Sequence, residues 1–256
     1  MNHLHEVLEA IESKRATVQE TIPEDKEIGI VKLFLSMAKD AVCFNAGDGI
    51  EIGNLSGIAE LIRLPFNVCW VEFFVNAASP DNRRVLFGAM CEMSGTDINV
   101  VPIVKNTKNQ TWHIMDVMVI RVDVSTKLIN YLTTPEMQNW YTSIGGILVR
   151  FLSALNCTNV RAIEESPPAA LNKARIRRGK QPLFSTWTLS ISIPKERRDS
   201  VALGGSHASP RVHLRRGHPR EYRPGSWTWV QPCAVGAKEN GMIHKDYKAV
   251  HAGSHA

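Results

Sequence analysis

Four segments rich in β-branched and aromatic residues follow one another in the middle of the chain, and no other feature limits the fold as strongly. They are FNVCWVEFFV (66–75), RRVLFGAMCEM (83–93), DINVVPIV (97–104) and WHIMDVMVIRVDV (112–124). Short stretches with the composition of turns separate them: ASPDN, SGT and KNTKNQ. Sequential strands joined by short turns predict an antiparallel meander in this region.

Apolar residues at helical spacing predict helices on both sides of these strands. The third helix should end before Pro65, and the fourth has Thr134 as its N-cap and Pro135 at its first position. The expected fold class is α+β, in which N-terminal helices pack on a mostly antiparallel sheet. The predicted helices cover residues 2–20, 23–41, 54–64 and 133–155.

The C-terminal third contains a basic segment and a β-hairpin signal. AALNKARIRRGK (169–180) has the pattern of a short basic helix or an extended arm, and FSTWTLSISI (184–193) alternates as a strand does. Further on, YRPGSW (222–227) predicts a tight turn. Residues 211–223 should therefore pair with residues 227–235.

The pattern of segments also suggests how the chain is divided. Residues 1–165 form the expected α+β core domain. Residues 166–250 form a basic C-terminal region that is either a separate subdomain or more of the same sheet, and residues 251–256 are an expected tail. The length of 256 residues suits one large domain or two small ones.

The sequence predicts a cytoplasmic protein that makes no use of a membrane. No stretch approaches about 18 consecutive apolar residues. The charged N-terminal segment lacks the apolar core of a signal peptide. The five cysteines are scattered without CxxC spacing, which predicts reduced and buried thiols.

Positive charge is concentrated near the C-terminus. The net charge of the whole chain is +5, but residues 170–224 contain 13 Lys and Arg against three acidic residues. Such a concentration is typical of a protein that faces a polyanion. The expected partner is nucleic acid, either DNA or RNA. A host protein with an acidic surface and a merely solvated basic surface are the alternatives.

Two stretches supply the side chains of the predicted nucleic-acid site. Their Lys and Arg residues would contact phosphates, and Tyr222 or Trp227 would stack on a base. On a helix, Lys173 and Arg177 would share one face. The full set is Lys173, Arg175, Arg177, Arg178 and Lys180 in the first stretch, and Arg211, Arg215, Arg216, Arg220, Tyr222, Arg223 and Trp227 in the second.

The second stretch also permits a catalytic interpretation. His213 and His218 would act as general base and acid on a phosphodiester, while an arginine stabilises the developing charge. A bulge at Gly217 would bring these histidines, Arg215 and Arg220 to one side of the strand. The chemistry would be that of a metal-independent endoribonuclease, because the 2′-hydroxyl of RNA supplies the nucleophile. Whether the protein is an enzyme is left open by the sequence.

The usual motifs for nucleotide, dinucleotide, zinc and α/β-hydrolase chemistry are absent from the sequence. No cofactor and no metal site are therefore expected. Glu72, inside the apolar segment VCWVEFF, should lie on the solvent face or pair with a basic residue, with a buried catalytic carboxylate as the alternative. His113 and Asp116 are interpreted as structural.

The segment HLRRGHPREYRPGSWTWVQPCAVG (213–236) combines a His-x-Arg-Arg-Gly-His-x-Arg stretch, a turn and a Trp-Val strand. Together with LNKARIRRGKQPL (171–183) and RLPFNVCWVEF (63–73), about 50 residues in all, it resembles a set of uncharacterised phage and prophage proteins. That set has no assigned activity, so the resemblance implies phage origin and not a reaction. Pro219 departs from the pattern, which favours a bulge or turn around His218.

The leading hypothesis is a phage- or prophage-encoded protein that binds nucleic acid through residues 171–180 and 211–227. The alternatives are an endoribonuclease centred on His213 and His218, and a phage inhibitor that binds and blocks a host protein. The oligomeric state is not indicated by the sequence.

Overall fold

The computed structural model describes residues 3–20, 22–47, 58–76, 84–106, 109–134, 138–191, 211–215, 217–230, 233–235 and 237–242. The helices within these ranges are α1 (Leu4–Glu12), α2 (Glu24–Ala38), the 3-10 helix η1 (Ile58–Leu61), α3 (Gln138–Leu155) and α4 (Ala169–Arg177). The strands are β1 (Thr17–Val18), β2 (Val42–Asn45), β3 (Val68–Asn76), β4 (Arg84–Ser94), β5 (Asp97–Lys105), β6 (Trp112–Ile114), β7 (Met118–Asp123), β8 (Leu128–Leu132), β9 (Val160–Glu165), β10 (Thr186–Ile191), β11 (Arg211–Arg215), β12 (His218–Arg223), β13 (Ser226–Val230), β14 (Cys233–Val235) and β15 (Ala237–Met242).

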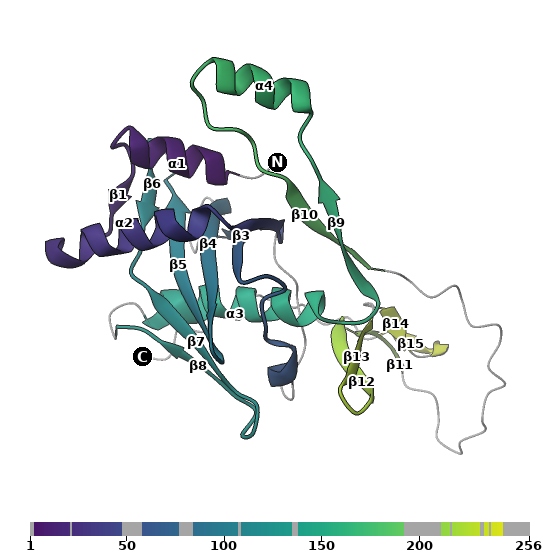
Figure 1. The fold of residues 1–256 in the computed structure, drawn as a ribbon. Helices are drawn as coiled ribbons and strands as arrows, with labels where there is room; N and C mark the ends of the chain where they lie inside the picture. Colours follow the sequence, from purple (N-terminus) through teal and green to yellow (C-terminus); the bar gives the residue numbers. More distant parts are fainter. Residues whose placement is uncertain are drawn as a thin grey trace.

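The described strands form one large mixed sheet and two small ones (Figure 1). Ten strands make the large sheet in the order β1-β6-β5-β4-β3-β2-β10-β9, and β7 and β8 continue from β5. The pairs β1–β6, β2–β3 and β2–β10 are parallel, and its other pairs are antiparallel. The fold is therefore α+β with a mostly antiparallel sheet, as the sequence predicts.

The predicted meander is present, but its last segment is two strands and not one. β5 pairs with β6 at one end and with β7 at the other, so residues 115–117 interrupt the segment. At this break the Asp116 carboxylate accepts a hydrogen bond from the Val117 N–H (2.7 Å), and the Asp116 carbonyl accepts one from the Tyr141 hydroxyl (2.8 Å). These bonds satisfy backbone and side-chain groups outside the ladder, which lets the chain leave the sheet.

Helices cover both faces of the large sheet. α1 and α2 pack on one face through residues such as Val7 and Phe34, and α3 packs on the other through Leu148 and its neighbours. The alternation of β3 explains the two cores, because Trp70 faces the first and Val71 the second. The N-terminal layer was expected, and α3 provides the layer opposite it. No helix in the described part of the chain is long and apolar enough to cross a membrane.

A buried carboxylate fastens α1 to the sheet. Glu72 is 2% exposed and accepts a hydrogen bond from the Trp70 indole N–H (2.7 Å). It also accepts one from the backbone N–H of His3, the residue that precedes α1, and its other oxygen lies 3.0 Å from the His3 Nδ1. A negative charge at a helix N-terminus is favourable. Glu72 therefore does not lie on the solvent face; it is buried, with His3 and Trp70 as its partners.

The chain then leaves the sheet and returns to it. β9 and β10 pair antiparallel at the edge of the large sheet, and α4 lies at the far end of this β9–β10 ribbon (Figure 1). β10 itself sits inside the large sheet, between β2 and β9. The first part of the basic C-terminal region therefore adds a strand to the same sheet as the predicted core domain.

The predicted hairpin turn is present at residues 224–225. β12 and β13 pair across it, and Gly225 has a φ of 71°, which glycine adopts without strain. Beyond them β11 pairs with β14 and continues the register of β12 with β13. His213 lies opposite Val235, and five residues later His218 lies opposite Val230. The predicted pairing of residues 211–223 with 227–235 is thus confirmed where the structure describes the chain.

Candidate nucleic-acid interface

The α4 arm, defined as residues 166–185, carries the first predicted basic cluster. Pro168 precedes the helix, where its fixed φ suits a helix start. Gly179 ends it with a φ of 66°, its N–H donating to the carbonyl of Ile176 and the Lys180 N–H donating to that of Arg175. This is the Schellman arrangement of a helix end, and it turns the basic segment back toward the sheet.

Polar contacts hold the α4 arm against α1. The Arg175 guanidinium donates to Glu9 (2.9 Å) and to the backbone carbonyl of Gln181 (2.8 Å). Gln181 in turn donates to Glu12 (2.7 Å). Arg175 is one of the predicted phosphate contacts. In the structure its guanidinium forms an ion pair with Glu9, and its side chain is only 18% exposed.

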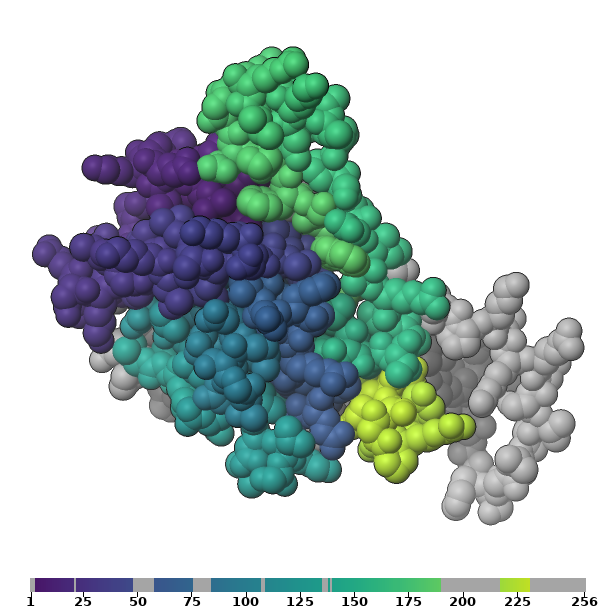
Figure 2. All heavy atoms as spheres, in the orientation of Figure 1, coloured from purple at the N-terminus to yellow at the C-terminus, as the bar shows by residue number. Residues whose placement is uncertain are grey.

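The other four cations of the α4 arm are exposed, and none has an acidic partner among the residues that the structure describes. They are Lys173, Arg177, Arg178 and Lys180. The helix buries none of its own residues, so this display of charge is not a by-product of core packing. In the space-filling view the arm projects from the body of the molecule (Figure 2).

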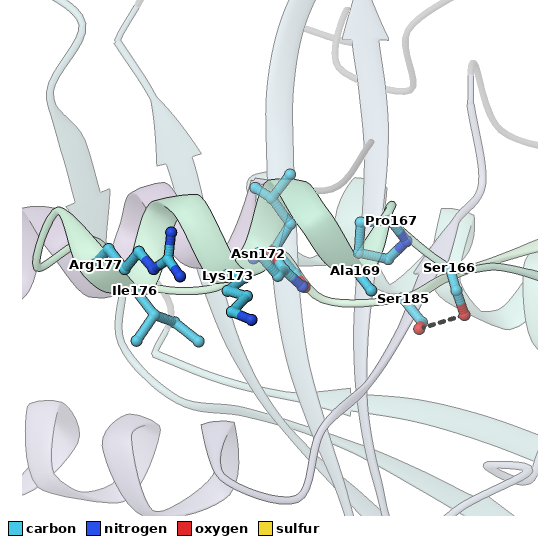
Figure 3. Close-up of a pocket in the computed structure, with 9 residues that line it drawn as sticks. Ser166, Pro167, Ala169, Asn172, Lys173, Ile176, Arg177 and Ser185 are labelled. Carbon is cyan, nitrogen blue, oxygen red and sulfur yellow. Dashed lines mark hydrogen bonds between the residues drawn. The ribbon is translucent and has the colours of Figure 1, made fainter.

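A groove of about 650 Å³ runs along one side of α4. Lys173, Ile176 and Arg177 line it from the helix, which confirms that the two cations share a face (Figure 3). Ser166 and Ser185 line its other end, with their hydroxyl oxygens 3.0 Å apart. The groove thus offers two cations, two hydroxyl groups and several apolar side chains, Ile176 among them, to a ligand.

The β12–β13 hairpin carries part of the second predicted cluster. Arg220, Tyr222 and Arg223 are exposed, Tyr222 to 53%. Trp227 is only half-exposed and packs against the larger core, so Tyr222 is the more accessible aromatic for base stacking. His218 is half-buried.

The remaining members of the second cluster are not placed by the structure. Arg216 and the side chains of Arg211, His213 and Arg215 lie outside the described residues. The backbone register is the same on both sides of Gly217, so the pairing gives no extra residue there and no support for the bulge. The histidine pair as a catalytic centre therefore stays a prediction.

The two basic clusters lie at opposite ends of the β9–β10 ribbon. At the start of β9, the Thr158 N–H donates to Trp227, and Asn159 exchanges hydrogen bonds with the backbone of Trp229 (2.6 and 2.8 Å). At the end of β9 the chain enters α4 (Figure 1). Six strand residues span about 20 Å, so within one copy the described cations of the α4 arm and of the β12–β13 hairpin do not form one patch.

No family model, curated protein or solved structure matches this chain. The candidate interface therefore rests on its own geometry and charge alone.

Other reactive side chains of the described residues are held in structural roles. Burial raises the pKa of the Cys69 and Cys157 thiols to about 12, and it raises those of Cys43 and Cys91 as well. These four thiols are free and buried, as predicted. The side chain of Cys233 lies outside the described residues. His113 lies within hydrogen-bond distance of Thr17 and Thr111, as a structural histidine should.

Sequence reasoning missed two features of the α4 arm. The first is the internal use of Arg175, which depends on a contact with Glu9, 166 positions away along the chain. The second is the pair Ser166 and Ser185, which the β9–β10 pairing brings together from both ends of the arm. The double proline at 167–168 was the available signal for the turn that makes this possible.

Proposed function

We propose that this protein binds nucleic acid through the α4 arm, with the β12–β13 hairpin as a second contact region. The observation that carries the proposal is the set of four exposed cations on the α4 arm, which have no acidic partner among the described residues. The helix of this arm buries no residue of its own. Lys and Arg side chains that neutralise phosphates supply most of the affinity of such interfaces. In this proposal the protein is phage- or prophage-encoded and works in the cytoplasm of the host cell.

The groove along α4 supports a contact with a single strand. Lys173 and Arg177 would contact successive phosphates, while Ile176 would cover a sugar or base between them. On the hairpin, Tyr222 would stack on a base beside Arg220 and Arg223. Aromatic stacking requires unpaired bases, so a stronger affinity for single strands than for duplexes is expected.

A double substitution in the groove tests the proposal. Lys173→Ala/Arg177→Ala should weaken binding of a labelled oligonucleotide by about tenfold or more, because each lost charge-assisted contact costs about 1 kcal/mol. Fluorescence anisotropy with single- and double-stranded DNA and RNA would measure it.

The control is Lys26→Ala/Lys32→Ala, which removes the same charge from two exposed positions of α2. An equal loss of affinity in both double variants would show a general charge effect and would overturn the assignment to the α4 arm.

A protein partner is the second candidate, favoured by Leu171 and Ile176. These side chains are 45% and 61% exposed on α4. If no oligonucleotide binds, a Leu171→Ser/Ile176→Ser variant that loses a protein captured by the wild type from nuclease-treated lysate would support this candidate.

A further inference from the structure

Strand β9 is the last strand of the large sheet, and no other described strand pairs with its outer edge. Among the described strands it pairs with β10 alone, so the backbone N–H and C=O groups on its other side have no strand partner. An exposed strand edge is a template for pairing with another chain, and proteins either block such edges or use them. The side chains of β9 indicate which of the two applies.

Arg161, Ile163 and Glu165 alternate on one face of β9, and all three are exposed. Ile163 is 50% exposed at the centre of the strand. No ion pair of Arg161 occurs within the described part of the chain, and Glu165 accepts only a long hydrogen bond from Thr188 (3.4 Å). A positive, an apolar and a negative side chain thus stand in a row with a symmetric spacing.

We propose that two copies of this chain pair through β9 in an antiparallel, two-fold symmetric arrangement. With Ile163 opposite Ile163 of the second copy, Arg161 of each copy lies opposite Glu165 of the other. Both charged pairs and the apolar contact then form at once, and opposite charges on facing strand positions stabilise a sheet. The two ten-stranded sheets become one continuous sheet across the dimer axis.

The neighbouring symmetric registers are worse. Moving the axis to Ala162 places Arg161 opposite Ile163, which removes both ion pairs. Moving it to Glu164 places that carboxylate opposite its own copy, which is unfavourable. In the proposed register Ala162 faces Glu164 of the other copy, so no like charges meet on the second face.

This pairing also joins the two basic clusters. β9 begins beside the β12–β13 hairpin and ends at α4, so antiparallel pairing puts the α4 end of one copy beside the hairpin end of the other. Each end of the dimer would then carry an α4 arm and a hairpin from different copies. This consequence rests on the proposed nucleic-acid function, whereas the β9 interface itself does not.

The mass of the protein in solution tests the interface without any nucleic acid. Analytical ultracentrifugation of the full chain should give twice the 28.5 kDa of one copy. If the protein keeps the mass of one copy up to the highest soluble concentration, the proposal is overturned.

Charge exchange tests the register. Arg161→Glu alone and Glu165→Arg alone each put like charges at both facing positions, so each should weaken the dimer by about tenfold or more. The double variant Arg161→Glu/Glu165→Arg should restore it. The two single variants, when mixed, should form a heterodimer, because every facing pair is then of opposite charge. Circular dichroism would show that each variant is folded.

A matched variant on another edge strand completes the test. β8 also pairs with one described strand only, and Leu132 is 40% exposed on it. Leu132→Asp should leave the dimer intact, while Ile163→Asp should dissociate it. The reverse result would place the interface on β8 and refute the β9 pairing. A dimer that passes these tests but binds no oligonucleotide would keep the interface and refute only the nucleic-acid function.

Discussion

At the scale of single residues, the position of the Trp70 ring depends on the absence of a side chain at Gly88. Its ring lies over Gly88 on the neighbouring strand β4, and its indole N–H reaches the buried carboxylate of Glu72. Glu72 and Gly88 face each other in the β3–β4 register. The glycine therefore leaves room for the ring that satisfies the carboxylate, and the carboxylate fastens α1.

Gly88→Ala should destabilise the protein. A Cβ at this position would lie 2.0 Å from the Trp70 Cη2, so the ring must move. Overpacking of this kind costs about 1–3 kcal/mol of unfolding free energy, as urea denaturation would measure. Gly29→Ala is the control, because nothing lies within 4 Å of its Cβ position and an alanine in helix α2 should stabilise by about 0.5–1 kcal/mol. Equal effects of the two substitutions would contradict this account of Gly88.

His5 should make stability depend on pH. It is 3% exposed, and burial, assisted by the charge of Arg175, lowers its pKa below the ordinary 6.5. The unfolded chain therefore binds more protons between the folded value and 6.5, so the unfolding free energy falls as the pH drops below 6.5. In His5→Leu that component of the slope should disappear. An identical pH dependence of unfolding in wild type and variant would show that His5 does not contribute.

At the scale of elements, the α4 arm is held by a few polar contacts. Asn172 exchanges two hydrogen bonds with the backbone of Leu183 (2.8 and 2.9 Å), and Arg175 reaches Glu9 on α1. A helix of nine residues is marginal by itself in water, so these contacts and its C-terminal turn are what keep it formed.

Arg175→Ala should loosen the α4 arm without unfolding the sheet. Backbone amides of residues 169–183 should exchange hydrogen faster, because the contacts to Glu9 and to the Gln181 carbonyl are lost. Arg177→Ala is the control. Arg177 lies two residues further along the same helix and is exposed, so its loss should leave exchange unchanged. Unaltered protection in Arg175→Ala would show that the arm is held in another way.

Most elements were predictable because their signals are local. The β3–β5 meander, the helices α2 and α4, and the 224–225 turn follow from periodicity and turn residues. The split between β6 and β7 was not, because it depends on the contact between Asp116 and Tyr141 on α3. Strand β8 was also missed, since its pattern follows directly on β7 through the short turn at 124–127.

At the scale of the whole molecule, the charge distribution was predictable and its geometry was not. The sequence shows one basic C-terminal segment, but the fold places β10 in the large sheet and so divides that segment in two. Parallel pairing of β10 with β2 involves residues more than 140 positions apart, and no local pattern encodes it. Because of this division, the proposed β9 dimer is what would place an α4 arm and a hairpin side by side.

The most direct test of nucleic-acid binding is the salt dependence of the dissociation constant for a single-stranded oligonucleotide. If the four exposed cations of the α4 arm contact phosphates, the slope of log affinity against log salt should be about −3, since each contact contributes about −0.7. Lys173→Ala/Arg177→Ala should reduce it by about half. A slope near zero, or no binding at low salt, would contradict the central claim that the α4 arm binds nucleic acid.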